Sequence, residues 1–194
     1  MAYGATYPTA EPALEAEIAR LRQELAEAKR RIAELEAHAD IDPLLDILNR
    51  RGFERALVRS LAYVQRYDTV AALMFIDLDG FKDINDRHGH AAGDALLKAV
   101  AAALTRHVRA SDVVGRLGGD EFGVVMWNVG GPLAAAKARD LERLIGEAGI
   151  AHGATQLHVG ASAGVVPLSV AAEVAQILDA ADRAMYARKR ERRG

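Results

Sequence analysis

Apolar residues recur alternately four and three positions apart along the first part of the chain. They are Leu14, Ile18, Leu21, Leu25, Ala28, Ile32, Leu35 and Ala39. The positions between them are mostly Glu, Arg, Gln, Lys and Ala, so the apolar stripe is narrow. This heptad predicts a coiled-coil dimerisation stalk at residues 12–41, which would be about 40 Å long. The alternative is an amphipathic helix packed on its own domain, which a narrow stripe disfavours.

Asp42-Pro43 breaks this helix, and helical and strand patterns alternate after it. The apolar run Val70–Ile76 predicts a buried strand, a Gly-Gly hairpin is expected between two valine-rich strands, and a further strand is expected near 157–166. Helices are expected at 51–66, around Phe81 and Ile84, and at about 92–108, 133–148 and 172–190. Because a hairpin pairs its strands antiparallel, we predict an α/β fold of the α+β type, with a central, mostly antiparallel sheet flanked by helices.

Composition narrows the class of protein. Hydrophobic residues make up 51% and charged residues 27%, which is typical of a soluble domain with a sizeable core. The net charge of −2 gives no basic field for nucleic-acid binding. The chain has no cysteine, so disulfides and thiolate chemistry are excluded. No apolar run could span a bilayer, so we expect neither membrane insertion nor a signal peptide. We expect a cytoplasmic location and a disordered segment at 1–11.

Gly118-Gly119-Asp120-Glu121 forms the expected hairpin tip. We expect the two glycines to supply positive φ angles and to let an anion approach the backbone. Asp77 follows the buried strand, where a carboxylate is costly unless it is paired or binds a metal. If the strands are neighbours, these acids converge and suit Mg²⁺, and two such ions support in-line nucleotidyl transfer. The alternative for Asp77 is an N-cap of the helix that begins near Phe81.

Asn85 and Asp94 lie in a polar, turn-rich segment directly after this strand. An amide can donate and accept hydrogen bonds, and a carboxylate can accept from guanine N1–H and the exocyclic amine. These two residues therefore have the chemistry to bind a guanine edge. Each could equally cap a helix.

Several motifs occur in order after the stalk. They are Asp42-Pro43-Leu44, Leu48-Asn49-Arg50-Arg51-Gly52-Phe53, Asp77, Phe81-Lys82, Asn85-Asp86, Gly89-His90, Gly93-Asp94, Gly118-Gly119-Asp120-Glu121-Phe122, Ser162-Ala163-Gly164-Val165 and Ala181-Asp182-Arg183-Ala184-Met185-Tyr186. Residues 42–194 thereby resemble the GGDEF-domain diguanylate cyclases of bacterial cyclic di-GMP signalling. The resemblance implies a fold like that of nucleotide cyclases and polymerase palms.

The resemblance also implies residue roles. Asp77, the Leu78 carbonyl, Asp120 and Glu121 would hold two Mg²⁺ ions, which Mn²⁺ could replace, with Asp120 and Glu121 catalytic. The substrate GTP would be bound by Lys82, Asn85, His90, Asp94, Gly118, Gly119, Lys189 and Arg193. Lys189 and Arg193 could instead be the basic end of a helix that complements the helix dipole.

Two departures from the family pattern stand out. Leu45-Asp46 replaces the usual Thr-Gly, and Arg192-Arg193-Gly194 replaces the usual Gly-Arg-Asn near the end. Upstream of the signature, Arg109-Ala110-Ser111-Asp112 resembles the family's inhibitory site for the product. An Arg-x-x-Asp pattern can bind guanine and phosphate, although it can also be a salt bridge at a helix end.

The residues support three functional hypotheses. The first is a homodimeric diguanylate cyclase that condenses two GTP into cyclic di-GMP and two pyrophosphates and is inhibited by its product. The second is a non-catalytic module that senses GTP or cyclic di-GMP and acts through its coiled coil, which degenerate signature residues would favour. The third is a dimeric adaptor whose main function is the coiled coil.

Overall fold

The computed structural model describes residues 11–38, 40–153, 155–168 and 173–193. The chain divides after residue 39 into two compact units. The segment predicted to be disordered lies outside the described residues, except for Glu11, where helix α1 (Glu11–His38) begins. On α1, the heptad residues Leu14, Leu21 and Leu25 are more than half exposed. An exposed heptad stripe suits a helical partner, and the coiled coil stays a prediction.

The second unit is built on a four-stranded sheet in the order β2-β3-β1-β6. The strands are β1 (Ala71–Asp79), β2 (Val113–Arg116), β3 (Glu121–Trp127) and β6 (Gly160–Pro167). All three strand pairs are antiparallel. The prediction of a central antiparallel sheet flanked by helices is therefore confirmed.

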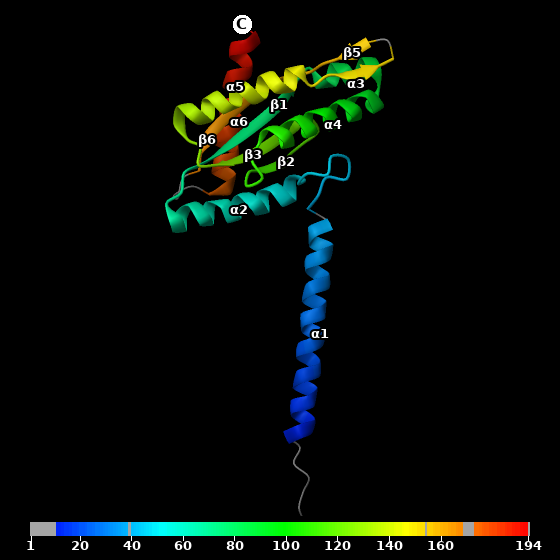
Figure 1. Ribbon diagram of the computed structural model, residues 1–194, viewed down its shortest axis with the longest axis vertical. Coiled ribbons are helices and arrows are strands. Elements are labelled where there is room, and N and C mark those ends of the chain that lie inside the picture. The colour runs from blue at the N-terminus through cyan, green and yellow to red at the C-terminus, as the bar shows by residue number, and fades with distance from the viewer. Residues whose placement is uncertain (1–10, 39, 154, 169–172, 194) are drawn as a thin grey trace, which may run out of the picture. The chain divides into compact units, whose positions relative to one another are not determined.

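Helices cover both faces of this sheet (Figure 1). They are α2 (Arg50–Tyr67), α3 (Phe81–His88), α4 (His90–His107), α5 (Gly131–Glu147) and α6 (Val174–Arg193). Alternate residues of β1 face opposite sides, as the pleat requires. Met74, Ile76 and Leu78 pack with residues of α4 and α5, whereas Leu73 and Phe75 pack with α2 and α6. The core thus has two layers, one on each face.

Several predicted boundaries were wrong in ways that matter for the site. Strand β1 continues through Asp79 instead of ending at Ile76, because β6 pairs with it as far as Asp79↔Gly160. The predicted strand near 157–166 is two elements: β6, and β5 (Thr155–Leu157), which pairs with β4 (Ile150–His152) in a separate hairpin. Across the described ranges, no helix has the length and apolar character needed to cross a membrane.

Candidate active site

The predicted acids meet where β1 and β3 lie side by side. Asp77 on β1 is the direct partner of Glu121 on β3, so both side chains lie on the same face of the sheet. Asp120 immediately precedes β3, and its carbonyl accepts a hydrogen bond of 3.1 Å from the Leu78 amide. Residues distant in sequence are thereby gathered where these two inner strands of the sheet meet, at the same end of both. We call Asp77, Leu78, Asp120 and Glu121 the acidic edge.

Asp77 cannot serve as the helix cap considered above. It lies inside β1, and the N-cap of α3 is Gly80, which makes no side-chain capping bond. Asn85 and Asp94 are also not N-caps, because both lie inside helices, in α3 and α4. The capping alternatives for all three residues are therefore wrong.

The acidic edge is electrostatically unfavourable without a cation. Burial raises the pKa of the Asp120 carboxyl, and the charge of Asp77 raises it further. The pKa of Glu121 is also raised, first by burial and then by Asp120, Asp77 and Asp182, with Arg50 opposing the shift. Clustered carboxylates whose charged forms are disfavoured gain from a bound cation. The donor set of carboxylate and carbonyl oxygens therefore fits a hard divalent ion such as Mg²⁺.

The acidic edge offers a metal few protein ligands. Among the described residues, no group of three or more His, Cys, Asp or Glu side chains is placed to hold a metal ion. Mg²⁺ commonly keeps several waters and uses one or two carboxylates together with substrate phosphates. The few protein ligands at this edge suit an ion that arrives with a nucleotide.

Lys189 on α6 reaches the acidic edge. Its ammonium donates a hydrogen bond to Asp77 Oδ1 and lies 3.9 Å from Asp79 Oδ1. This contact places a predicted phosphate ligand directly beside a predicted metal ligand. The side chain of Arg193 lies outside the described side chains.

Two arginines brace the turn that carries the signature, and sequence reasoning assigned neither of them a role. Arg116 donates to the carbonyls of Gly118 and Gly119, at 3.0 and 2.7 Å, and to the Asp42 carboxylate at 3.2 Å. Arg50 donates to the Leu117 carbonyl at 3.2 Å. The sequence did carry a signal for these contacts, because Arg116 lies two residues before the signature, and Asp42 and Arg50 belong to motifs that open the domain.

The expected role of the signature glycines was partly wrong. Neither Gly118 nor Gly119 is among the residues with positive φ. A Cβ at Gly118 would lie 2.3 Å from Glu121 Oε2, so glycine at this position leaves room for the Glu121 carboxylate as it stands. A Cβ at Gly119 would have no neighbour within 4 Å, which leaves that backbone open to an approaching anion.

The predicted base-binding residues come from two adjacent helices. Asn85 on α3 lies against Gly93 on α4, where a Cβ would be 1.9 Å from Asn85 Oδ1 and would displace the Asn85 side chain. Asp94, the next residue, is exposed, as are Lys82 and His90. The close approach of α3 to α4 thus places Asn85 beside the residue that precedes Asp94. Their contact with guanine stays a prediction.

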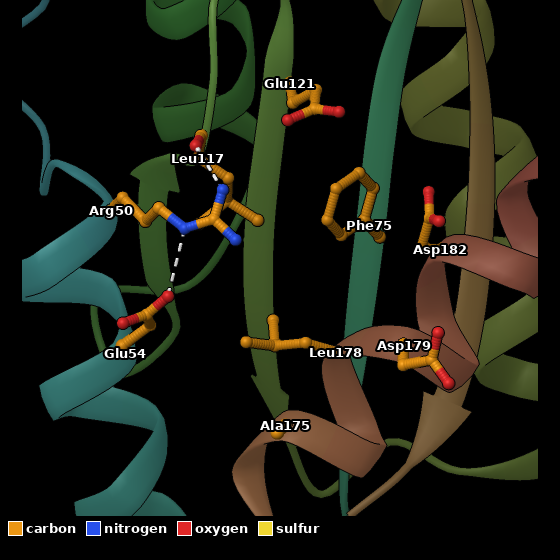
Figure 2. Close-up of a pocket in the computed structure, with 9 residues that line it drawn as sticks. All are labelled: Arg50, Glu54, Phe75, Leu117, Glu121, Ala175, Leu178, Asp179 and Asp182. Carbon is orange, nitrogen blue, oxygen red and sulfur yellow. Dashed lines mark hydrogen bonds and ion pairs between the residues drawn. The ribbon is translucent and has the colours of Figure 1, made fainter.

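A cavity of about 420 Å³ opens beside Glu121 between α2 and α6, as Figure 2 shows. Its lining residues are Arg50, Glu54, Phe75, Leu117, Glu121, Ala175, Leu178, Asp179 and Asp182. Arg50 stands between Glu54, at 3.1 Å, and the Leu117 carbonyl. The lining includes neither Asn85 nor Asp94, so this cavity is distinct from the predicted base-binding residues.

Arg109 and Asp112 form a compact turn between α4 and β2. Asp112 accepts hydrogen bonds from the backbone amides of Arg109, at 2.9 Å, and Trp127, at 3.1 Å. The Arg109 guanidinium lies 3.5 Å from the Trp127 carbonyl. Within the described part of the chain, the Arg109 and Asp112 side chains form no ion pair with each other. The salt-bridge alternative is therefore wrong. Both residues line a cavity of about 390 Å³ beside Ile47 and Val113.

Comparison with known proteins supports the class that the signature indicates. Residues 39–194 match the model of the family described as diguanylate cyclase, GGDEF domain. Over 89% of its length, the chain is 36% identical to the probable diguanylate cyclase DgcE of Escherichia coli strain K12. Over 84% of its length, it is 36% identical to the diguanylate cyclase TpbB of Pseudomonas aeruginosa. The chain belongs to the diguanylate cyclase GGDEF-domain family.

Solved structures agree with this assignment. The GGDEF domain of TpbB superposes with a TM-score of 0.71 at 36% identity, covering 78% of this chain and 89% of that one. The coiled coil and GGDEF domain of DgcB from Caulobacter crescentus, in complex with c-di-GMP, has the same fold, with a TM-score of 0.76 at 24% identity and coverage of 92% and 95%. The chain spans only 16% of the length of DgcE and 38% of that of TpbB.

Proposed function

We propose that this protein is a diguanylate cyclase, which condenses two GTP into cyclic di-GMP and two pyrophosphates. The observation that carries the proposal is the convergence of Asp77, Asp120 and Glu121 at one edge of the sheet, within an intact signature. A sensing module without catalysis is the weaker candidate, because it would be expected to have lost one of these acids.

Binding of GTP is assigned to two sets of side chains. Asn85 and Asp94 contact the guanine edge, with His90 nearby, and a base without the matching groups leaves them unpaired. Lys82, Lys189 and Arg193 contact the distal phosphates, and the open backbone at Gly119 allows the triphosphate to lie close to the turn. These contacts fix the α-phosphate beside the acidic edge.

The reaction joins the 3′-oxygen of one GTP to the α-phosphorus of the other. The bond from that phosphorus to the oxygen bridging to the β-phosphate breaks, pyrophosphate leaves, and the same step repeated in the opposite sense closes the ring. Asp77, the Leu78 carbonyl, Asp120 and Glu121 would hold Mg²⁺ or Mn²⁺, which neutralises the phosphate charge and acidifies the 3′-hydroxyl. Glu121 is proposed to support the metal or the 3′-hydroxyl.

Two domains must face each other, because each is assigned one GTP. The heptad on α1 supports a dimer, and a coiled coil would raise the effective concentration of one domain near the other. Residues 12–41 are therefore proposed as a stalk and 42–194 as the catalytic domain. Product inhibition is assigned to Arg109 and Asp112.

The test is incubation of the purified full chain with GTP and Mg²⁺, followed by chromatography. We expect cyclic di-GMP and pyrophosphate in a ratio of one to two. Guanosine product other than cyclic di-GMP, or unchanged GTP at protein concentrations that favour dimers, would contradict the proposal.

A further inference from the structure

Lys189 and Arg192 extend from the last turns of α6 over the end of β1. Lys189 pairs with Asp77, and the two side chains are only 18% and 16% exposed. Water screens such a pair less than it screens a pair on the open surface. The ammonium therefore supplies much of the positive charge that the acidic edge receives from the protein.

Asp79, two residues further along β1, has its own partners. Ser162 Oγ donates to both of its carboxylate oxygens, at 3.0 and 3.2 Å. Arg192 lies 3.5 Å from Asp79 Oδ2 and also donates to the Ala161 carbonyl. Since Arg192 and Ser162 already pair with the Asp79 carboxylate, Lys189 pairs mainly with Asp77.

We propose that Lys189 is an internal counterion of Asp77 that competes with a divalent cation for this carboxylate, and that the triphosphate of GTP relieves the competition. This inference rests on the proposed function. The Asp77 oxygen cannot contact an ammonium and a metal ion at full strength together, because the two cations repel each other. A triphosphate offers Lys189 other anionic oxygens, which its flexible stem and three donors can reach.

The consequence is coupled binding. A divalent ion alone must displace Lys189 from Asp77. When the ion binds together with GTP, Lys189 contacts the triphosphate instead, and the Asp77 carboxylate is free to bind the ion. Coupling of this kind is reciprocal, so the ion also strengthens the binding of GTP. Lys189 therefore makes the binding of the metal depend on GTP, in addition to contacting the phosphates.

The first measurement is the binding of Mn²⁺ alone to the full chain, from the amplitude of the free-ion signal in electron paramagnetic resonance. Lys189→Met should tighten Mn²⁺ binding about fivefold, because the competitor is gone. Arg192→Met is the matched control, since it removes one positive charge from the same helix but leaves the partner of Asp77. It should change Mn²⁺ affinity by less than about twofold.

The second measurement is calorimetric titration with α,β-methylene GTP in the presence of Mn²⁺. Here Lys189→Met should weaken binding about tenfold, because a phosphate contact is lost. A change of opposite sign in the two titrations is what the competition requires. Unchanged or weaker binding of Mn²⁺ alone to Lys189→Met would overturn it, as would an equal tightening by Arg192→Met, which would indicate net charge only.

Asp77→Asn separates this inference from the proposed function, and a thermal unfolding curve establishes that each variant is folded. If Asp77→Asn weakens Mn²⁺ binding and Lys189→Met fails to tighten it, the metal assignment stands and the competition is wrong. If Asp77→Asn leaves Mn²⁺ binding unchanged, the metal assignment is wrong and the competition with it.

Discussion

Carboxylates are used in opposite ways at the acidic edge and at the Arg109–Asp112 turn. At the acidic edge, Asp77, Asp120 and Glu121 lie together, and burial, followed by mutual repulsion, raises the pKa values of Asp120 and Glu121. At the turn, the single carboxylate of Asp112 accepts two backbone amides from residues on either side of β2. The first arrangement lowers the stability of the fold, and the second increases it.

This difference separates carboxylates that await a counter-charge from a carboxylate that the fold itself already satisfies. Functional sites commonly retain groups that destabilise the protein, because the ligand supplies what is missing. A carboxylate that is satisfied by backbone amides is stable in the folded protein without a ligand. If the comparison is right, removing charge should have opposite effects on stability in the two places.

Asp120→Asn should have the largest effect on activity. It removes a proposed metal ligand, so turnover should fall about a thousandfold or more. The free energy of unfolding should stay the same or rise by up to about 1 kcal/mol, because a repulsive charge is gone. Initial rates of cyclic di-GMP formation and urea unfolding measure the two quantities. Turnover within tenfold of the wild type would remove Asp120 from the site.

Arg109→Ala should leave the initial rate and the stability nearly unchanged, since its contact with the Trp127 carbonyl is long at 3.5 Å. It should weaken inhibition by added cyclic di-GMP at least about tenfold, because a guanidinium that can pair with phosphate is lost. Progress curves with and without added product provide the measurement. Equal inhibition of variant and wild type would leave this turn with a structural role alone.

Asp112→Ala should destabilise the fold by about 1–2 kcal/mol, because two backbone amides lose their acceptor. Asp112→Asn is the matched control, since its amide oxygen can still accept, and it should lose less. Urea unfolding of the two variants gives the comparison. A wild-type stability for Asp112→Ala would mean that water replaces the carboxylate at no cost, and the contrast between the two regions would fail.

The smallest expected effect is a dependence of stability on pH. Because the folded-state pKa values of Asp120 and Glu121 are raised, the folded protein binds more protons than the unfolded chain between the ordinary and the raised values. The stability from these groups is therefore present at low pH and is lost as the pH rises through the raised values. The gain in stability from Asp120→Asn should thus shrink as the pH falls from 7 toward 4. A constant gain would argue against repulsion at this edge.

The amino-acid sequence predicted most elements of the catalytic unit but not their contacts. The apolar run of β1 and the Gly-Gly hairpin were sufficient to predict an antiparallel sheet, because their patterns are strong and local. The β4–β5 hairpin was missed, since strands of three residues carry too little periodicity. The end of β1 was misplaced because pairing with β6 extends the strand through two acidic residues.

The residues of the site were predicted better than their contacts, because contacts between side chains form only when the chain folds. Residue types indicated Asp77, Asp120 and Glu121 for the metal and Asn85 and Asp94 for the base. The resemblance to a family indicated the remaining ligands. The braces from Arg116 and Arg50 and the contact of Lys189 with Asp77 depend on side chains that meet only after folding. No spacing along the chain shows that Lys189 and Asp77, from α6 and β1, touch.

The central claim is that the acidic edge binds a divalent cation together with GTP. The most direct measurement is thermal unfolding of the wild type and of Asp77→Asn, each with and without Mn²⁺ and α,β-methylene GTP together. The melting temperature of the wild type should rise by several degrees with this pair of ligands, because they bind only the folded state, and that of the variant should rise much less. An equal rise in both proteins would contradict the account.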